Sequence, residues 1–558
     1  MDFKQKVVEL ISSQVELPKE KINSLIERPK NPEMGDYAFP AFILAKTLHK
    51  NPAEIAKAIV ANLSDDNFEK IQAVGPYVNF SIKKSALISQ TLEEVLVKKN
   101  NYGNQNLGSG NVAIDMSSPN IAKPMSMGHL RSTVIGNSIA KILTKVGYTP
   151  IKINHLGDYG TQFGKLITAY KLWGNEEDVK KDPINSLFHY YVKFHEVAEE
   201  KPELEDEGRA WFKKLEGGDS EAVKLWNWFR KVSLQEFNRI YKKLNVEFDS
   251  YHGEAFYNDK MDAIVDELRQ KDLLVESRGA QVVDLGPDKN PAMILKSDGT
   301  SIYTTRDLTA AEYRKKHYDF VQALYVVGNE QSAYFEQLKE VLKKMGHEWA
   351  DDIHHIPFGL ITQGGKKLST RKGNVVFLDK VLEDAVELAM KQIETKNPSL
   401  PNKEQVANEV GIGAVVFHDL KNDRLDAFDF NLEEVVRFEG ETGPYVQYTN
   451  ARAQSILRKA NQIVTIDELD LSDEWAFAVA KDLADFPAVL AKASEKYEPS
   501  IIAKFALKLA KHFNKYYANV RILDEDDQLA ARLALVKATS IVLTESLHLL
   551  GVAAPKEM

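Results

Sequence analysis

The segment from Val112 to Val146 places the tightest limits on how this chain can fold. Val112–Met116 is a short apolar run typical of a buried β-strand. It is followed by a turn that contains Pro and Gly, and then by a run with apolar residues at roughly helical spacing: Leu130, Val134, Ile139, Ile142, Leu143 and Val146. A strand, a turn and a helix in this order predict the beginning of an α/β layer.

The start of the predicted helix is a candidate phosphate site. The first amides of a helix have no partners within it, and its dipole favours negative charge. Gly128 would let a ligand approach the backbone, and His129 could donate a hydrogen bond to a phosphoryl oxygen. A lone Gly-His pair is more typical of an ordinary surface turn. The hypothesis therefore depends on the whole string Ser117–Ser132, SSPNIAKPMSMGHLRS.

Composition narrows the class of protein. The 558 residues, 44% of them hydrophobic, are enough for several globular domains. The chain has no cysteine, which excludes disulfides, a thiolate nucleophile and thiolate-ligated zinc, and which fits a reducing compartment. The first residues do not resemble a secretory signal, and no uncharged apolar run approaches the ~20 residues that cross a bilayer. We expect a soluble, cytoplasmic protein.

Three domains are predicted: an α+β domain at 1–97, a doubly wound α/β domain of Rossmann type at 98–442, and an all-α helical bundle at 443–558. In the first domain, Val74–Phe80 is predicted to be a strand. Residues from about 165 to 272 are strongly charged and helical in pattern, and the α/β pattern resumes at Val321–Val327. An insertion between the two halves of a doubly wound sheet explains this order.

A basic loop lies at 365–373 with the sequence GKKLSTRKG, between the apolar segments Ile356–Thr362 and Asn374–Leu378. A cation-rich loop suits a reaction that displaces phosphate, because negative charge builds up on the departing pyrophosphate. Taken alone, the loop could equally be the charged tip of a hairpin.

A lysine stripe is predicted on one helix of the last domain. Its members follow at steps of four, three and four residues: Lys504, Lys508, Lys511 and Lys515. No acidic residue occurs between Ile501 and Arg521, although the whole chain has a net charge of -9. Such a stripe can be a solvated helix face or an RNA surface. The missing carboxylates and the neighbouring Tyr516 and Tyr517 favour RNA, since tyrosines can stack on bases.

The string Ser117–Ser132 closely resembles the first signature of class I aminoacyl-tRNA synthetases, in the extended form of the arginyl-tRNA synthetases. The chain departs from that signature at Ser126, where the family has a histidine. The loop at 365–373 resembles the second signature of the same class. Further stretches that look like arginyl-tRNA synthetase are DGTSIYTTRDL from Asp298, YVVGNEQ from Tyr325, GPYVQY from Gly443 and GVAAP from Gly551. The resemblance covers essentially the full length.

The resemblance implies a two-step reaction. Arginine attacks the α-phosphorus of ATP and releases pyrophosphate, and the arginyl group then passes to the terminal ribose of tRNA. The catalytic positions implied are Ser126, His129, Lys366, Lys367, Ser369, Arg371 and Lys372. Those implied for ATP are Ser126, Gly128, His129 and Lys367. Mg²⁺ would bridge the ATP phosphates, without a dedicated metal site in the protein.

The resemblance also implies substrate contacts. The family positions for arginine fall on Asp115, Asn120, Tyr303, Asp307 and Gln331, with Asp307 and Tyr303 facing the guanidinium. The alternative interpretation makes Asp307 a helix N-cap and Tyr303 a buried strand residue. For tRNA, the C-terminal domain would receive the anticodon stem and loop. Its implied contacts are Lys504, Lys508, Lys511, Asn514, Lys515 and Tyr517.

The expected partners are tRNA(Arg), L-arginine and ATP, with no membrane, and the chain is expected to act as a monomer. Two other functions fit parts of the sequence. A smaller-substrate nucleotidyltransferase, such as a pantothenate synthetase-like enzyme, would not need the helical last third with its lysine stripe. A catalytically impaired tRNA-binding relative is favoured only by Ser126, and the intact Gly128, His129 and basic loop speak against it.

Overall fold

The structure is a computed structural model that describes residues 3–297, 299, 302–364, 366–367, 377–466 and 469–558, with only the backbone of Pro32, Gln363, Lys366 and Lys367. Its internal contacts divide the chain into two units. The first unit comprises residues 1–102, 449–486 and 508–545, and the second comprises residues 103–448, 487–507 and 546–558.

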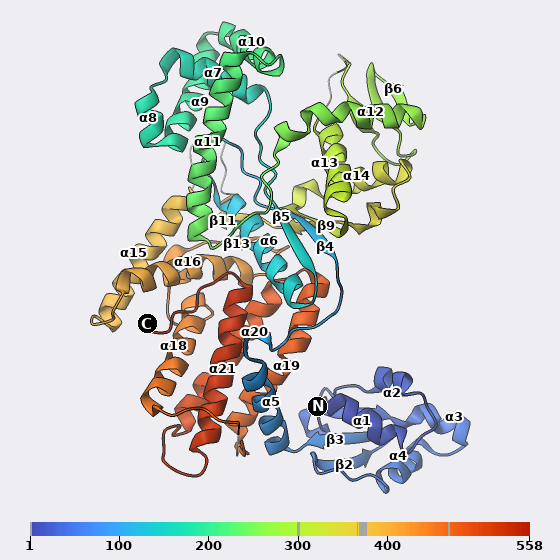
Figure 1. Cartoon of the computed structure of the whole chain (residues 1–558). Helices are drawn as coiled ribbons and strands as arrows, with labels where there is room; N and C mark the ends of the chain where they lie inside the picture. Colours follow the sequence, from blue (N-terminus) through green and yellow to red (C-terminus); the bar gives the residue numbers. More distant parts are fainter. Residues whose placement is uncertain (1–2, 298, 300–301, 365, 368–376, 467–468) are drawn as a thin grey trace. The chain divides into compact units, whose positions relative to one another are not determined.

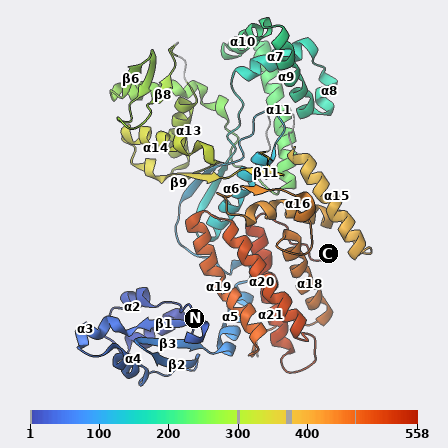
Figure 2. The same ribbon diagram turned by 180° about the vertical axis from the view of Figure 1, so that it is seen from behind.

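The N-terminal part of the first unit is an α+β domain, as predicted. Its antiparallel sheet has the order β1-β3-β2, with β1 at Tyr37–Pro40, β2 at Phe68–Val74 and β3 at Tyr77–Ile82. Figure 2 shows this sheet with α4 beside it. The helices are α1 (Phe3–Ser12), α2 (Lys19–Leu25), η1 (Pro32–Met34), η2 (Ala41–Leu44), α3 (Ala45–Leu48), α4 (Pro52–Val60), α5 (Lys84–Lys98) and η3 (Lys99–Asn101).

The prediction of a single strand at Val74–Phe80 was wrong. Strand β2 ends at Val74, and β3 begins at Tyr77, which pairs directly with Val74. Between them, Gly75 has a φ of +55° and is followed by Pro76. A left-handed glycine next to a proline favours a tight turn, so the apolar run is divided between two strands of a hairpin.

The second unit is built on a parallel sheet of order β10-β9-β4-β5. Its strands are β4 (Asn111–Asp115), β5 (Thr149–Ile153), β9 (Phe320–Gly328) and β10 (Ile353–Phe358). Helix α6 (Met127–Lys145) connects β4 to β5, and α14 (Ser332–Lys344) connects β9 to β10, flanked by η5 (Asn329–Gln331) and η6 (Glu348–Asp352). The connections run outward from the β4/β9 pair in opposite directions. The carboxyl ends of β4 and β9 therefore form the topological switch point where α/β proteins bind ligands.

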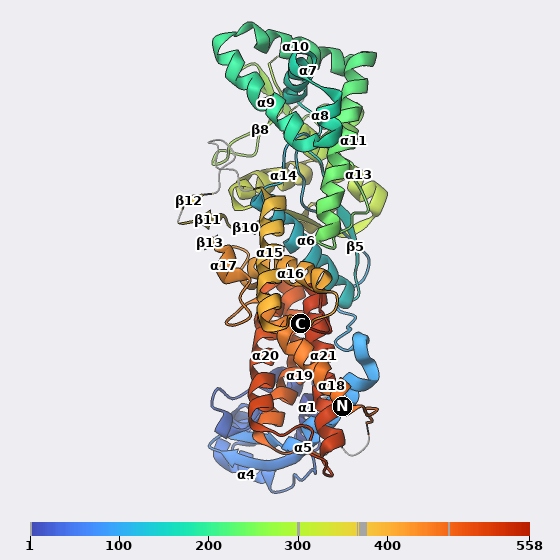
Figure 3. The same ribbon diagram turned by 90° about the vertical axis from the view of Figure 1, so that its left-hand side faces the viewer.

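The long connection between β5 and β9 contains the predicted helical insertion. Its helices are α7 (Thr161–Trp173), α8 (Glu176–Lys181), α9 (Pro183–Glu200), α10 (Glu203–Glu216), α11 (Ser220–Lys243), η4 (Glu254–Lys260) and α12 (Met261–Gln270). Figure 3 shows α7, α9 and α10 packed together. The sequence did not reveal the antiparallel sheet that follows, β6 (Leu274–Ser277), β7 (Ala280–Val283) and β8 (Ala292–Leu295), before α13 (Tyr303–Tyr318).

One hydrophobic cluster fixes α13 and α14 against the central sheet. It contains Leu308 of α13, Phe320 of β9, and Leu338 and Leu342 of α14, each fully buried. Burying a side chain of this size contributes about 1.5–3 kcal/mol, so neither helix can shift without a large loss of stability. The polar residues at the first turns of α13 and α14 are therefore held in place beside the switch point.

The rest of the chain is mainly helical. A small sheet has the order β12-β11-β13, with β11 at Ile361–Gln363, β12 at Lys366–Lys367 and β13 at Phe428–Asp429. The helices are α15 (Leu378–Lys396), α16 (Lys403–Lys421), α17 (Leu432–Val435), α18 (Gly443–Ala460), α19 (Glu474–Lys496), α20 (Ser500–Asn519) and α21 (Leu529–Leu549). Figure 1 shows α18 to α21 side by side. The predicted Rossmann-type core and C-terminal all-α bundle are both confirmed.

Candidate active site

The turn between β4 and α6 is held in a strained shape. Ser117, Ser118 and Ala122 have φ values of +72°, +47° and +61°, which cost about 1–3 kcal/mol each for residues other than glycine. The backbone N–H of Ser117 donates to Ser132 Oγ at 2.8 Å, and the Ser117 hydroxyl lies 2.7 Å from the hydroxyl of Tyr241. Contacts with Ser132 of α6 and Tyr241 of α11 thus fix the conformation of the turn.

Helix α6 begins with a reciprocal contact between Ser126 and His129. Ser126 is the N-cap residue, and its backbone N–H donates to His129 Nδ1 at 3.0 Å, with Ser126 Oγ at 3.1 Å from the same nitrogen. Because Nδ1 accepts a hydrogen bond, the neutral ring carries its proton on Nε2. Burial lowers the pKa of His129 to about 4. His129 is therefore a neutral donor at physiological pH.

Nothing packed around Gly128 requires this residue to lack a side chain. A Cβ at Gly128 would meet only Ser126 Oγ, at the ordinary contact distance of 3.6 Å. The residue is exposed in the first turn of α6, where the backbone N–H groups lack partners within the helix. The space beside it is thus open to a ligand, and the helix terminus there favours an anionic one.

The chain after the basic loop is attached to the first signature. Phe377 forms an isolated antiparallel bridge with Ser126, and the N–H of Leu378 donates to the carbonyl of Met125 at 2.9 Å. The loop at 365–373 lies in part outside the described residues, which include neither Ser369, Arg371 nor Lys372. Lys366 and Lys367 form β12, antiparallel to β11.

Arg131 joins α6 to the small sheet that carries the basic loop. Its side chain, 1% exposed, lies 3.4 Å from the carboxylate of Asp419, which is 2% exposed. It also donates to the carbonyls of Gly359 at 2.8 Å, Asp426 at 3.1 Å and Arg424 at 3.3 Å. Sequence reasoning missed this residue, because nothing in the string at 117–132 shows that Arg131 points into the protein.

Asp115 ends strand β4 at the switch point and is engaged in a buried ion pair. Arg314 of α13, 2% exposed, donates to it at 2.8 Å, and the Ser118 hydroxyl donates to its other oxygen at 3.0 Å. The guanidinium of Arg314 also lies over the ring of Tyr325, 5.3 Å from its centroid. The carboxylate of Asp115 is thus balanced by a charge of its own chain.

Asp307 and Tyr303 both lie in helix α13, so the alternative interpretation of these two residues is wrong. Helix α13 begins at Tyr303, which is 61% exposed instead of being buried in a strand. Asp307 lies in the second turn and is not the N-cap, a position that Ile302 occupies. The hydroxyl of Tyr334 donates to Asp307 Oδ2, and burial raises the pKa of Asp307 to about 6.

A second carboxylate, Glu254, interacts with Asp307. Burial raises the pKa of Glu254 to about 7, and the negative charge of Asp307 adds to this effect. Arg306 Nη1 lies 3.8 Å from Glu254 Oε1, and its charge lowers the pKa of Glu254 by more than the charge of Asp307 raises it. Glu254 begins η4 after the insertion, and its N–H donates to the carbonyl of Leu156, just beyond β5. No motif or periodicity in the sequence marks this residue.

Asn120 and Gln331 lie on the connections that follow the two switch-point strands. Asn120 is exposed and forms a parallel bridge with Gly157. A Cβ at Gly157 would come within 2.2 Å of Asn120 Oδ1, so a larger residue there would displace the Asn120 side chain. Gln331 is exposed in η5, directly before α14. Arg314 and Tyr334 thus link three of the predicted arginine contacts, Asp115, Tyr303 and Asp307. The other two, Asn120 and Gln331, lie on adjoining connections.

The lysine stripe lies on α20 as predicted, and all four of its lysines are exposed. Within α20 the stripe has no compensating carboxylate, as the sequence shows, but the neighbouring helix supplies one. Asp482 of α19, 1% exposed, lies 2.6 Å from Lys508 Nζ and 2.5 Å from His512 Nδ1. The pattern within one helix could not show a carboxylate supplied by the neighbouring helix.

The residues beside the stripe differ in accessibility. Tyr516 is fully buried, so the expectation that its ring could stack on bases was wrong. Tyr517 is 46% exposed, with the guanidinium of Arg452 at 4.8 Å from its ring centroid. Asn514 donates to Thr449 Oγ1 at 2.8 Å and accepts from Arg452. Tyr517 therefore offers an aromatic face, whereas Asn514 already joins α20 to α18.

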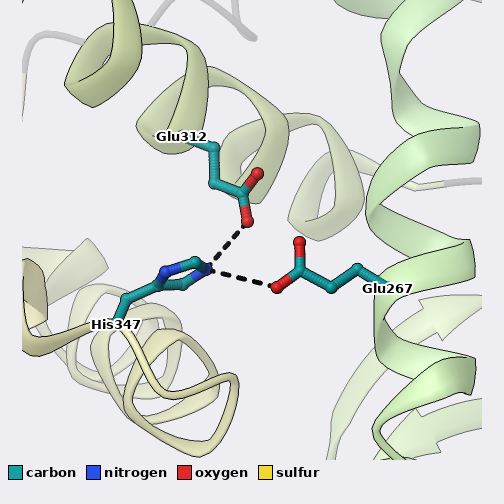
Figure 4. Close-up of side chains that lie close together, drawn as sticks. All are labelled: Glu267, Glu312 and His347. Carbon is teal, nitrogen blue, oxygen red and sulfur yellow. Dashed lines mark hydrogen bonds and ion pairs between the residues drawn. The ribbon is translucent and has the colours of Figure 1, made fainter.

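One group of potential metal ligands comes together within the described residues: Glu267, Glu312 and His347, whose ligand atoms lie within 4.8 Å of one another. Figure 4 shows the ring of His347 between the two carboxylates, with Nε2 at 2.9 Å from Glu312 and 3.7 Å from Glu267. Lys271 Nζ lies 2.7 Å from the same oxygen of Glu267. These contacts form a polar network that joins α12, α13 and the connection to η6.

In the part of the chain that the structure describes, no helix is long and apolar enough to cross a membrane.

Comparison with known proteins identifies the family of each part of the chain. Three family models match: "Arginyl tRNA synthetase N terminal domain" at residues 1–82, "tRNA synthetases class I (R), catalytic domain" at 91–432, and "DALR anticodon binding domain" at 446–558. Arginine–tRNA ligase of Lactobacillus johnsonii is 77% identical over 558 residues, covering 100% of both chains. That of Lactiplantibacillus plantarum is 63% identical over 562 residues, again with 100% coverage.

Solved structures agree with these matches. The arginyl-tRNA synthetase of Thermus thermophilus superimposes with a TM-score of 0.82 at 27% identity, covering 100% of both chains. The arginyl-tRNA synthetase of Plasmodium falciparum has the same fold, with a TM-score of 0.78 at 23% identity, covering 100% of this chain and 99% of the other. By its sequence over the full length and by its fold, the chain belongs to the arginyl-tRNA synthetase family.

Proposed function

We propose that this chain is an arginine–tRNA ligase, which activates L-arginine with ATP and transfers the arginyl group to the 3'-terminal ribose of tRNA(Arg). The observation that supports this most is the pair of partly buried carboxylates, Asp307 and Glu254, beside the switch point. Burial raises the pKa of both carboxylates, and the charge of Asp307 further raises that of Glu254, so an added cationic group beside them favours their ionised forms. A guanidinium substrate would supply one.

The pocket for arginine would be formed by residues of α13, α14 and the strand ends. A guanidinium presents five N–H donors in a plane, so it is best met by carboxylate and neutral oxygen acceptors. Asp307 and Glu254 would receive the guanidinium, with the exposed ring of Tyr303 beside it. Asp115, Asn120 and Gln331 would serve the α-amino group, the carboxylate or the pocket wall. Since Asp115 is neutralised by Arg314, its expected role is in the wall.

ATP would bind at the start of α6. Ser126, Gly128 and His129 present hydroxyl, amide and imidazole donors there, which suit phosphate oxygens better than a cation. The basic loop would contribute Lys366, Lys367, Ser369, Arg371 and Lys372 to the departing pyrophosphate. Mg²⁺ would be held by the ATP phosphates and would neutralise their charge. The arginine carboxylate would attack the α-phosphorus as the bond to pyrophosphate breaks, so the protein positions the reactants and forms no covalent bond.

tRNA would be bound by the helical C-terminal domain. The exposed lysines of α20, together with Tyr517, offer phosphate and base contacts of the kind that single-stranded loops use. Asn514, which joins α20 to α18, is a further expected contact of the tRNA. We further propose that the chain acts in the cytoplasm and as a monomer, the latter to be checked by light scattering after gel filtration.

The test is exchange between labelled pyrophosphate and ATP, run with and without tRNA, followed by aminoacylation of tRNA(Arg). We expect exchange with L-arginine and none with L-lysine or L-citrulline, which lack a charged guanidinium. The proposal would be refuted by exchange that proceeds equally well without arginine. It would also be refuted if the protein bound tRNA but catalysed no exchange when tRNA and arginine were both present.

A further inference from the structure

We propose that Tyr334 is a positioning residue whose hydroxyl holds Asp307 as an ionised and oriented carboxylate that receives the guanidinium of arginine. The inference rests on the proposed function, and it assigns a role to a residue that the sequence reasoning did not select. Tyr334 lies in the first turn of α14, on a different element from Asp307, and its hydroxyl donates to Asp307 Oδ2.

The Tyr334 hydroxyl is held rigidly. Its ring is half-buried against the hydrophobic cluster that includes Leu338 and Leu342 of the same helix, and its centroid lies 5.3 Å from that of Tyr303. Because Leu308 anchors α13 in the same cluster, both partners of the hydrogen bond are fixed by one core. The donor thus fixes one carboxylate oxygen and leaves the rotamer of Asp307 little freedom, which favours an oriented ion pair with the guanidinium.

The charges around Asp307 show why this donor affects ionisation as well as orientation. The groups that interact with Asp307 are Tyr334 from α14, Arg306 and Arg314 from its own helix, Asp115 from β4 and Glu254 from η4. Burial is the largest effect and raises the pKa of Asp307 to about 6, whereas the hydrogen bond from Tyr334 lowers it. Burial and the Asp307 charge raise the pKa of Tyr334, so the phenol stays protonated and remains a donor.

These pKa shifts determine how removal of the Tyr334 hydroxyl should change arginine binding. Replacing Tyr334 by Phe keeps the ring and removes the donor, so the protonated form of Asp307 is favoured and its pKa rises above about 6. Loss of a hydrogen bond to a charged group corresponds to a rise of about one to two pKa units. Arginine binds the ionised form, so the variant should lose more affinity than the wild type as pH falls. In the wild type, only protonation of Glu254, with a pKa of about 7, weakens binding over most of the range above about pH 6.

The experiment is calorimetric titration of L-arginine into the wild type, Tyr334→Phe and Tyr318→Phe at about pH 6.5 and about pH 8.5. Tyr318 is the matched control, since its ring packs on the same cluster and lies on α13 away from Asp307. For Tyr334→Phe we expect the Kd for L-arginine, relative to that of the wild type at the same pH, to be about tenfold higher at the lower pH. At the higher pH it should be less than about threefold higher. The control should follow the wild type at both.

An equal loss of affinity at both pH values would show a merely structural role for Tyr334, and unchanged affinity at both would show no role, so either result would overturn the inference. A wild type that binds no arginine at either pH would instead contradict the proposed function. Circular dichroism of each variant shows whether it is folded, and the pH dependence within a single folded variant remains decisive even if its stability is reduced.

Discussion

Replacement of His129 by Ala is the sharpest test of the crevice at the start of α6. The structure makes this histidine a neutral donor through Nε2, because Nδ1 accepts the N–H of Ser126 at 3.0 Å and burial lowers the pKa to about 4. Removing a preorganised donor that faces developing charge costs about 10²–10³ in kcat. We therefore expect His129→Ala to lower the rate of arginine-dependent pyrophosphate exchange by that factor.

Ser126→Ala is the matched comparison, since it removes the hydroxyl beside His129 and leaves the ring. The serine caps α6, so its loss should cost about 1 kcal/mol of stability. Because the backbone N–H of Ser126 still donates to Nδ1, the tautomer is preserved and exchange should fall by less than about tenfold. The assay is exchange at saturating arginine and tRNA. A His129→Ala enzyme within about threefold of wild type, or an equal loss in both variants, would refute this account of the site.

The lowered pKa of His129 also predicts how the stability of the folded protein changes at acid pH. The pKa of His129 in the folded protein, about 4, lies below its ordinary value of 6.5. The unfolded chain therefore binds the proton first, and the stability linked to this group is lost as pH falls from about 6.5 to about 4. The thermal midpoint of His129→Ala should decline less steeply over this interval than that of wild type, and parallel declines would contradict the assignment.

Three further predictions concern other parts of the chain. Asp307→Asn should weaken the use of arginine by about 1.5–3 kcal/mol, seen as a lower kcat/KM for arginine with little change for ATP; a kcat/KM near wild type would remove Asp307 from the pocket. Lys504→Gln with Lys515→Gln should lower the slope of log K against log salt for tRNA by a little under one unit per lost phosphate contact; an unchanged slope would make the stripe a solvated face. Arg131→Met should destabilise the protein by about 3–5 kcal/mol in chemical denaturation, because it leaves the carboxylate of Asp419 buried without its partner. Part of that loss should be recovered in Arg131→Met/Asp419→Leu, because the buried carboxylate is gone while three carbonyls still lack the donor that Arg131 supplied; no recovery would contradict this cause.

The sequence by itself determined the local chemistry. The apolar run at Val112–Met116 and the helical spacing after His129 were enough to predict a strand, a turn and a helix, because side-chain periodicity follows directly from backbone geometry. The same holds for the lysines of α20, whose common face depends only on their spacing. The resemblance to family signatures then added the expected class of reaction and the positions expected to face ATP and arginine.

Only the tertiary structure decided which residues meet across different elements. The pairing of Asp307 with Tyr334, of Arg131 with Asp419 and of Lys508 with Asp482 joins residues that no periodicity relates. Burial is equally non-local, since the low pKa of His129 depends on how the chain packs around it. Sequence patterns report the direction of a side chain from its own backbone. What lies opposite that side chain, and how much water remains there, is set by the packing of the whole fold.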